Sequence, residues 1–328
     1  MALAIPSVPL ILMGICLCFR IANYNSPETK DPKKIRMTKI DELLYVAISL
    51  DIDPDANSAV EGRHDTLSFP IEHGKINIEA CRKGLQRILE CLDFYDIDAT
   101  LFYEARTAQM LIADRMDLPG LSERHEVACH SLKHEDFLGK VSGMPMDEKS
   151  IDNAVTEAKR ILEDIFKRDI KGFRAPYTRI NRAIVKILEQ TGFQYDSSET
   201  IAMGKEWKGG PFPLEMFDSN LLELALPSFY DAKGKRMSSY LWAIFEGRRV
   251  SGDYIEAVLW ARGVAKGGLF VFSIHPWHLY VDCQGNSFNR EQVQKNWENL
   301  EYILSQLKRM QGVQIIRQDN YLDQWLQS

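Results

Sequence analysis

Ionisable side chains follow several apolar runs of this sequence, and their types are those of metal ligands and acid–base catalysts. Asp51 and Asp53 close the run 43–53, and the alternation of a β-strand puts both carboxylates on the same face. Like charges this close together need a cation or a shared proton. The alternative is a solvated turn, since Asp-Ile-Asp-Pro-Asp is also ordinary loop sequence.

Two histidines that are four residues apart follow another apolar run. If His134 lies on the first turn after the strand that ends at His130, both imidazoles reach one point, a spacing typical of divalent-metal sites. With Asp53 they form a set of two histidines and one carboxylate that leaves coordination positions open, as in catalytic sites. Zn²⁺ is the expected ion, and Co²⁺, Ni²⁺ and Mn²⁺ also accept such ligands. The alternative is a chance pair of surface histidines.

Three further runs also end in ionisable residues. These residues are Arg174, Asp196 and His275. In barrels and open α/β sheets, functional groups gather at the carboxyl ends of the strands, and burying so many ionisable groups there is costly unless they serve a metal or a reaction. For Arg174 the alternative is a surface ion pair, although the Ala-Pro that follows it fixes the local backbone.

The elements that must position these residues alternate along the chain. Strands are expected at 43–53, 99–103, 126–131, 170–176, 193–198, 221–229, 269–276 and 313–317. Helical periodicity is strongest over 78–94, 151–166 and 293–310. Because parallel strands need crossover helices, this alternation favours an α/β fold with a parallel sheet or barrel.

Composition narrows the function classes. The 328 residues carry 46 Asp and Glu against 40 Lys and Arg, a formal charge of -6, so that a nucleic-acid partner is not expected. A neutral or cationic substrate suits this balance better. Nothing in the sequence predicts an oligomeric state.

Three parts of the chain are expected: an apolar segment 1–22, a polar linker 23–42 and a catalytic domain 43–328. The apolar run 2–19 lacks the basic start of a signal peptide and is barely long enough to span a bilayer. Membrane association through this run, with the basic residues after it holding the domain on the cytoplasmic side, is the expectation, and export is the alternative. The six cysteines contain no CxxC pair and are expected to be free thiols.

Three aromatic residues are candidates for binding a substrate. Trp207 lies in a Gly- and Pro-punctuated stretch, 201–220, that is long enough to act as a lid. Tyr230 could line a groove, and Trp277 is either a stacking platform for a sugar or a core residue. The remaining histidines have no partner at a metal spacing, so surface or packing roles are expected. They are His64, His73, His125 and His278.

Five motifs occur in the order found in the NodB-type polysaccharide deacetylases, which the sequence resembles. They are LDID (50–53), HSLKH (130–134), FRAPY (173–177), YDSS (195–198) and FSIHPW (272–277). The resemblance covers about residues 43–328 and implies a distorted (β/α)7 barrel with its site at the carboxyl rim. It also implies that Asp53, His130 and His134 are the metal ligands.

The resemblance assigns acid–base roles to the other motif residues. Asp51 would be the general base, oriented by Arg174, and His275 the general acid, oriented by Asp196. The backbone N–H of Tyr177 would donate a hydrogen bond to the oxyanion.

The implied activity is the metal-dependent removal of N-acetyl groups from an amino-sugar polymer or glycan precursor. The first motif is Asp-Ile-Asp where adjacent aspartates are commoner in the family. That form resembles a branch with peptidoglycan deacetylase-like and allantoinase-like members. The alternatives are therefore an allantoinase-like or deformylase-like hydrolase of another C–N amide bond and a non-catalytic carbohydrate-binding relic.

Overall fold

A curled, mostly parallel sheet organises the chain, and the computed structural model describes residues 43–54, 77–205, 207–214, 217–231 and 233–327 of it. The strands are β1 Leu44–Ile52, β2 Thr100–Tyr103, β3 Glu126–Cys129, β4 Gly172–Phe173, β5 Tyr195–Asp196, β6 Thr200–Ala202, β7 Phe212–Pro213, β8 Leu222–Glu223, β9 Leu226–Tyr230, β10 Arg236–Ser238, β11 Leu269–Ile274 and β12 Val313–Ile315. The main sheet runs β11-β1-β2-β3-β4-β5-β8-β7, and β12 pairs with the start of β1. Every residue of β1 is buried, as expected for a strand covered on both faces.

The sheet closes on itself through a second, smaller set of strands. β5 and β6 follow one another in the chain and pair in parallel with β8 and β9, respectively. β10 pairs with β9, and just beyond it Tyr240 forms a bridge with Ser273 of β11. The barrel wall therefore runs in the order β11, β1, β2, β3, β4 and β5, continues through β8, and passes to the smaller sheet of β6, β9 and β10. The segment that follows β10 returns to β11 at Tyr240 and closes the barrel. This confirms the distorted (β/α)7 barrel.

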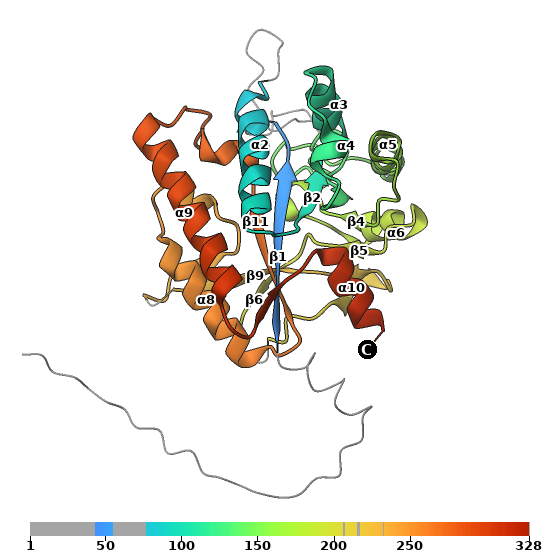
Figure 1. Ribbon diagram of the computed structural model, residues 1–328. Helices are drawn as coiled ribbons and strands as arrows, with labels where there is room; N and C mark the ends of the chain where they lie inside the picture. The colour runs from blue at the N-terminus through green and yellow to red at the C-terminus, as the bar shows by residue number, and fades with distance from the viewer. Residues whose placement is uncertain (1–42, 55–76, 206, 215–216, 232, 328) are drawn as a thin grey trace, which may run out of the picture. The chain divides into compact units, whose positions relative to one another are not determined.

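Helices connect the strands and surround them (Figure 1). They are α2 Glu79–Phe94, α3 Ala105–Ala113, α4 Leu118–Leu121, α5 Glu148–Phe166, α6 Arg182–Gln190, α7 Trp242–Phe245, α8 Ser251–Val264, α9 Arg290–Arg309 and α10 Gln318–Leu326, with the 3-10 turns η1 Pro176–Thr178 and η3 Pro276–Leu279. Side chains just before four of the described helices accept a hydrogen bond from the first turn, which fixes where those helices begin. These N-caps are Asp117 for α4, Asp147 for α5, Asn181 for α6 and Asn289 for α9.

The expected strands and helices are present, with shifted ends. The run 221–229 contains two strands, β8 and β9, and the three periodic stretches correspond to α2, α5 and α9. The stretch 201–220 contains the end of β6 and the short β7, which the sequence did not predict. The helix α8 was also not predicted, because its apolar residues, which include the exposed Leu259 and Trp260, are spread around the helix and form no single stripe.

Several expectations concern residues that the structure does not describe. The segments 1–22 and 23–42, His64 and His73 lie outside the described residues. Within the described ranges, none of the helices has the length and apolarity needed to cross a bilayer. In the same ranges no disulfide involves Cys81, Cys91, Cys129 or Cys283.

Candidate active site at the carboxyl ends of the strands

Asp53, His130 and His134 converge on one buried volume, as the sequence predicted. Their possible ligand atoms all lie within 4.8 Å of one another. The Asp53 Oδ2 atom is 3.3 Å from Nε2 of His134 and 4.0 Å from Nε2 of His130. Burial lowers the pKa of His130 to about 4, so that its imidazole is neutral at neutral pH and offers a lone pair. The donor set fits a divalent ion.

The two histidines reach this volume from a strand end and a loop, without the helical turn that their spacing suggested. His130 directly follows β3, whereas Ser131 (φ 66°) and His134 (φ 57°) adopt left-handed backbone conformations in the loop beyond it. His130 Nδ1 is 2.8 Å from the backbone carbonyl oxygen of Arg174. A proton on Nδ1 would donate to this carbonyl and leave Nε2 directed at Asp53.

Asp51 lies in β1, two residues before Asp53, and both of its carboxylate oxygens accept a hydrogen bond. Its Oδ1 accepts a 2.6 Å hydrogen bond from Arg174, and its Oδ2 accepts one of 2.5 Å from the Tyr240 hydroxyl. Burial acts to raise the pKa of Asp51. The charges of Arg174 and the neighbouring imidazoles, together with the hydrogen bond from Tyr240, lower this pKa by more than burial raises it, so that it lies well below its usual value. Asp51 is therefore ionised.

Arg174 is completely buried and spans the inside of the barrel. Its Nη1 also donates to the Ser49 and Ser273 hydroxyls, each at 2.9 Å, and its Nε donates to the Ser197 carbonyl at 2.9 Å. Its guanidinium carbon lies 4.1 Å from the centre of the Phe102 ring. A buried charge with this many partners is a rigid anchor for Asp51, and the surface ion pair considered for Arg174 is excluded.

His275 faces both aspartates from the end of β11. Its Nε2 is 3.9 Å from Oδ2 of Asp51 and 3.9 Å from Oδ2 of Asp53. Its side chain is 22% exposed, whereas both carboxylates are 1% exposed, so that the imidazole is the group of the three that meets solvent. The Tyr240 ring stacks on it with centroids 5.3 Å apart and planes inclined by 17°.

Trp277 and Tyr177 lie beside the metal ligands. The indole N–H of Trp277 donates to Oδ1 of Asp53 at 2.7 Å, and the residue is only 6% exposed. Trp277 therefore orients a candidate ligand from within the core and offers no open face for a sugar. Tyr177 has a positive φ of 58° in η1, and its ring packs edge-on against His134 with centroids 4.8 Å apart.

Asp196 does not accompany His275 in the structure. Its carboxylate accepts a 2.7 Å hydrogen bond from the Ser198 hydroxyl and lies beside the buried Glu223. Burial raises the pKa of Glu223 well above its usual value, and the charge of Asp196 raises it further. Among the described residues, the carboxylates within 4 Å of the His275 imidazole belong to Asp51 and Asp53. These contacts therefore do not support the expectation that Asp196 orients His275.

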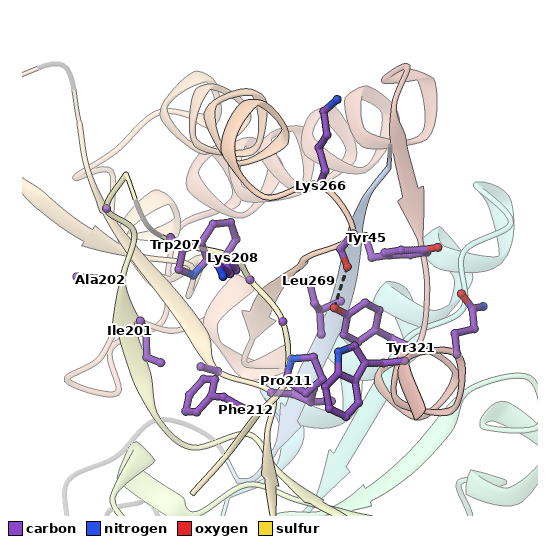
Figure 2. Close-up of a pocket in the computed structure, with 18 of the residues that line it drawn as sticks. Tyr45, Ile201, Ala202, Trp207, Lys208, Pro211, Phe212, Lys266, Leu269 and Tyr321 are labelled. Carbon is purple, nitrogen blue, oxygen red and sulfur yellow. Dashed lines mark hydrogen bonds between the residues drawn. The ribbon is translucent and has the colours of Figure 1, made fainter. Parts of the chain in front are cut away.

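Trp207 lies at the other end of the barrel, so the expected lid over the site is wrong. It lines a cavity of about 820 Å³ together with Tyr45, Leu269 and Tyr321 (Figure 2). Tyr45 and Leu269 are at the amino ends of β1 and β11, whereas Asp51 and His275 are at their carboxyl ends. Six residues of extended strand separate Tyr45 from Asp51, about 20 Å at ~3.3 Å per residue.

Tyr230 ends β9 and is 62% exposed, which leaves its ring accessible to a ligand. The sequence reasoning missed Tyr240, Ser49 and Ser273. A signal existed for the serines, because Ser49 precedes Asp51 by two residues and Ser273 precedes His275 by two, which puts each pair on one strand face. Tyr240 belongs to no motif, and only closure of the barrel brings it to the site.

Residues 71–195 match the model of the polysaccharide deacetylase family. The matched segment contains His130, His134 and Arg174 and ends before Asp196 and His275. No curated protein matches the sequence.

Solved structures share the fold. A protein from Mycobacterium smegmatis described as a polysaccharide deacetylase superposes with a TM-score of 0.61 at 18% identity, over 87% of this chain and 90% of that one. A second such protein, from Pseudomonas aeruginosa, gives 0.56 at 16% identity over 88% and 92% of the chains. PuuE allantoinase also gives 0.56 at 16% identity, over 87% and 91%. The resemblance to the NodB-type polysaccharide deacetylases is thereby confirmed, and its Asp-x-Asp branch remains a prediction.

Proposed function

We propose that this chain is a metal-dependent hydrolase that removes N-acetyl groups from an amino sugar. Its residues 71–195 match the polysaccharide deacetylase family, and it shares its fold with solved structures described as polysaccharide deacetylases. The observation that carries the proposal is the convergence of Asp53, His130 and His134 on one buried volume. Beside it, the His275 imidazole lies 3.9 Å from a carboxylate oxygen of both Asp51 and Asp53. Two ionised aspartates and the neutral imidazole of His130 in a buried volume form a site suited to a divalent cation.

The ligand set fits the ion on two further grounds. Asp53 Oδ2 and His134 Nε2 are 3.3 Å apart, close to the separation of about 3.3 Å expected for two ligands at ~2.0 Å in tetrahedral geometry. The indole N–H of Trp277 and the backbone carbonyl oxygen of Arg174 hold Asp53 and His130 from outside, as is typical of metal ligands. Zn²⁺ is the proposed ion.

The residues around the ligands supply acid–base chemistry. A bound divalent ion supplies a Lewis acid that polarises the amide carbonyl and lowers the pKa of water. Asp51 accepts the proton of the attacking water as a C–O bond forms, with Arg174 and Tyr240 fixing both of its oxygens. His275 donates a proton to the amine nitrogen as the C–N bond breaks, and acetate and the free amine leave. The backbone N–H of Tyr177 donates to the developing oxyanion.

Substrate contacts are proposed at the solvent-facing side of His275. Tyr230 is kept as a candidate for contact with a sugar ring, whereas Trp277 and Trp207 are not, because of their positions. The second candidate activity is hydrolysis of another C–N amide bond, as in an allantoinase. The Asp-Ile-Asp form of the first motif favours it, and so does the shared fold of PuuE allantoinase.

The proposed location is the cytoplasmic side of a membrane, with residues 2–19 as the association segment. None of the four described cysteines forms a disulfide, as a reducing compartment requires. This location favours a small or lipid-linked glycan precursor as the substrate over a finished wall polymer.

The test combines metal binding with turnover. Zinc added to the metal-free protein should raise Tm and produce acetate from N-acetylglucosamine oligomers, and His134→Ala should abolish acetate release and lower the number of bound zinc ions by one. Asp51→Asn should keep the zinc-dependent Tm rise and lose on the order of 10²-fold or more in rate, because a base acts only in the transition state.

The exposed carboxylate Asp152 gives the control, and Asp152→Asn should behave as the wild type. An unchanged number of bound zinc ions in His134→Ala would refute the ligand assignment. Turnover of allantoin with no release of acetate would replace the first activity by the second.

A further inference from the structure

A second set of metal-ligating side chains lies outside the site described above. Glu246 follows α7, His278 lies in η3, and Cys283 lies in the loop beyond it. Their possible ligand atoms all lie within 4.8 Å of one another. His278 is 1% exposed and Glu246 7%, whereas Cys283 is exposed and gives the cluster a path to solvent. From its sequence alone, His278 was expected to have only a surface or packing role.

The three groups do not form a nucleophilic triad. The Glu246 Oε1 atom is 3.2 Å from Nε2 of His278, and the Cys283 Sγ atom is 3.6 Å from the same nitrogen. In a triad the carboxylate holds one ring nitrogen and the nucleophile the other. Burial, with the adjacent charge of Glu246, raises the pKa of Cys283 to about 12, so that the thiol is protonated and unreactive.

The separations between Glu246 Oε1, His278 Nε2 and Cys283 Sγ fit ligand atoms placed around a single ion. At Zn–N and Zn–O distances of ~2.0 Å and a Zn–S distance of ~2.3 Å, tetrahedral angles put N and O about 3.3 Å apart and N and S about 3.6 Å apart. The observed separations are 3.2 Å and 3.6 Å.

The charges also match a divalent cation. Burial lowers the pKa of His278, so its imidazole is neutral, and the pKa of Glu246 is lowered by its hydrogen bond with His278, so its carboxylate is ionised. A carboxylate and a thiolate together neutralise a 2+ ion. Arg248 pairs with the other Glu246 oxygen, Oε2, at 2.8 Å, while Oε1 faces His278 and accepts the backbone N–H of Cys283 at 2.9 Å.

We propose that Glu246, His278 and Cys283 bind a second divalent ion of the zinc class through Oε1, Nε2 and Sγ, with water as the fourth ligand. Binding forms the metal–sulfur bond and releases the thiol proton to solvent, while the imidazole proton moves to Nδ1. A sulfur ligand selects a softer ion than the all-N,O site does. The inference does not depend on the proposed hydrolase activity.

An ion at the second site would also steady the first site. The Trp277 and His278 rings stack with centroids 4.6 Å apart and planes inclined by 24°, and the Trp277 indole donates to Asp53. An ion that fixes His278 therefore fixes η3, and with it the orientation of Asp53 and of the adjacent His275.

Co²⁺ alone is the probe, because only a thiolate ligand gives cobalt an intense near-ultraviolet charge-transfer band. The full-length protein, stripped of metal and titrated with Co²⁺, should develop that band. His134→Ala, which damages the first site, should keep it. Cys91→Ser, which removes a half-buried thiol elsewhere in the protein, should also keep it. Cys283→Ser should lose it and retain one bound cobalt.

Glu246→Gln, which keeps the thiol, should move the midpoint of the cobalt titration upward by about tenfold or more and guards against misfolding of the cysteine variant. The absence of the band in the wild type, its persistence in Cys283→Ser, or an unmoved midpoint in Glu246→Gln would each overturn the second site. Loss of the zinc response in the first site leaves the band unaffected, so that failure of the proposed function and failure of this inference are distinguishable.

Discussion

Each oxygen of Asp51 has its own donor. Arg174 provides a charged, fully buried partner on one side, and Tyr240 provides a hydroxyl on the other, while the Tyr240 ring also stacks on His275. One tyrosine thus contacts both the proposed base and the proposed acid. It is a positioning residue for both groups.

Tyr240→Phe removes the hydroxyl and keeps the ring. A hydrogen bond to a charged acceptor contributes about 1.5 kcal/mol or more, so kcat/KM should fall by about tenfold or more. Because this bond lowers the pKa of Asp51, its loss should move the acidic limb of the pH–rate profile to higher pH. Steady-state kinetics across pH measures both effects.

Tyr302→Phe, on the exposed side of α9, is the matched control and should leave the profile unchanged. An unaltered kcat/KM in Tyr240→Phe, with the fold intact, would show that the hydroxyl does not position Asp51.

At the scale of elements, η3 lies directly against α2. A Cβ built on Gly84 would be 2.0 Å from the carbonyl oxygen of Pro276. Only glycine allows the helix and the turn to come this close, and the turn carries Trp277 and follows His275. A glycine within a helix lowers its stability. We expect the position of η3, and with it that of Trp277 and His275, to depend on Gly84.

Gly84→Ala should displace η3 and lower both stability and turnover. Overpacking of this kind costs about 1–3 kcal/mol, although alanine is the better helix former. Gly263→Ala in α8 is the matched change, because a Cβ there meets nothing within 4 Å. It should raise stability by up to about 1 kcal/mol. Urea unfolding and kcat compare the two, and equal behaviour would exclude the close contact as a determinant of the site.

At the scale of the whole molecule, the barrel uses the chain from its first described residues. Leu44, Tyr45 and Val46 are buried and pair with β12, and Tyr45 and Val46 also pair with β11. The Leu44 N–H donates to the Gly312 carbonyl at 2.9 Å. The start of β1 therefore joins the end of the chain to the barrel.

A shortened chain, 43–328, should keep the Tm and zinc-dependent turnover of the full chain. A chain that starts at residue 47 loses three buried side chains and should be destabilised by on the order of 5 kcal/mol, enough to unfold many domains. Thermal and denaturant unfolding measures both. Sedimentation with membranes of the full chain but not of 43–328 would support the association segment, and equal partition would contradict it.

The alternation of strands and helices and most of the site residues could be predicted from the sequence because they are encoded locally. Apolar periodicity reports which face of an element is buried, and the residue that ends a strand reports what the rim carries. The cluster of Asp53 with the two histidines followed because parallel strands end at one edge, whereas the pairing of Asp51 with Arg174 was implied by the family resemblance.

Only the tertiary structure decided which distant groups meet. The Asp196 carboxyl lies beside Glu223 of the neighbouring strand, Trp207 lies at the amino end of the barrel, and Tyr240 reaches the site where the barrel closes. The Glu246, His278 and Cys283 cluster likewise joins a helix end, a turn and a loop. Strand register and barrel closure depend on contacts between residues far apart in the chain, and no local pattern of residue types encodes them.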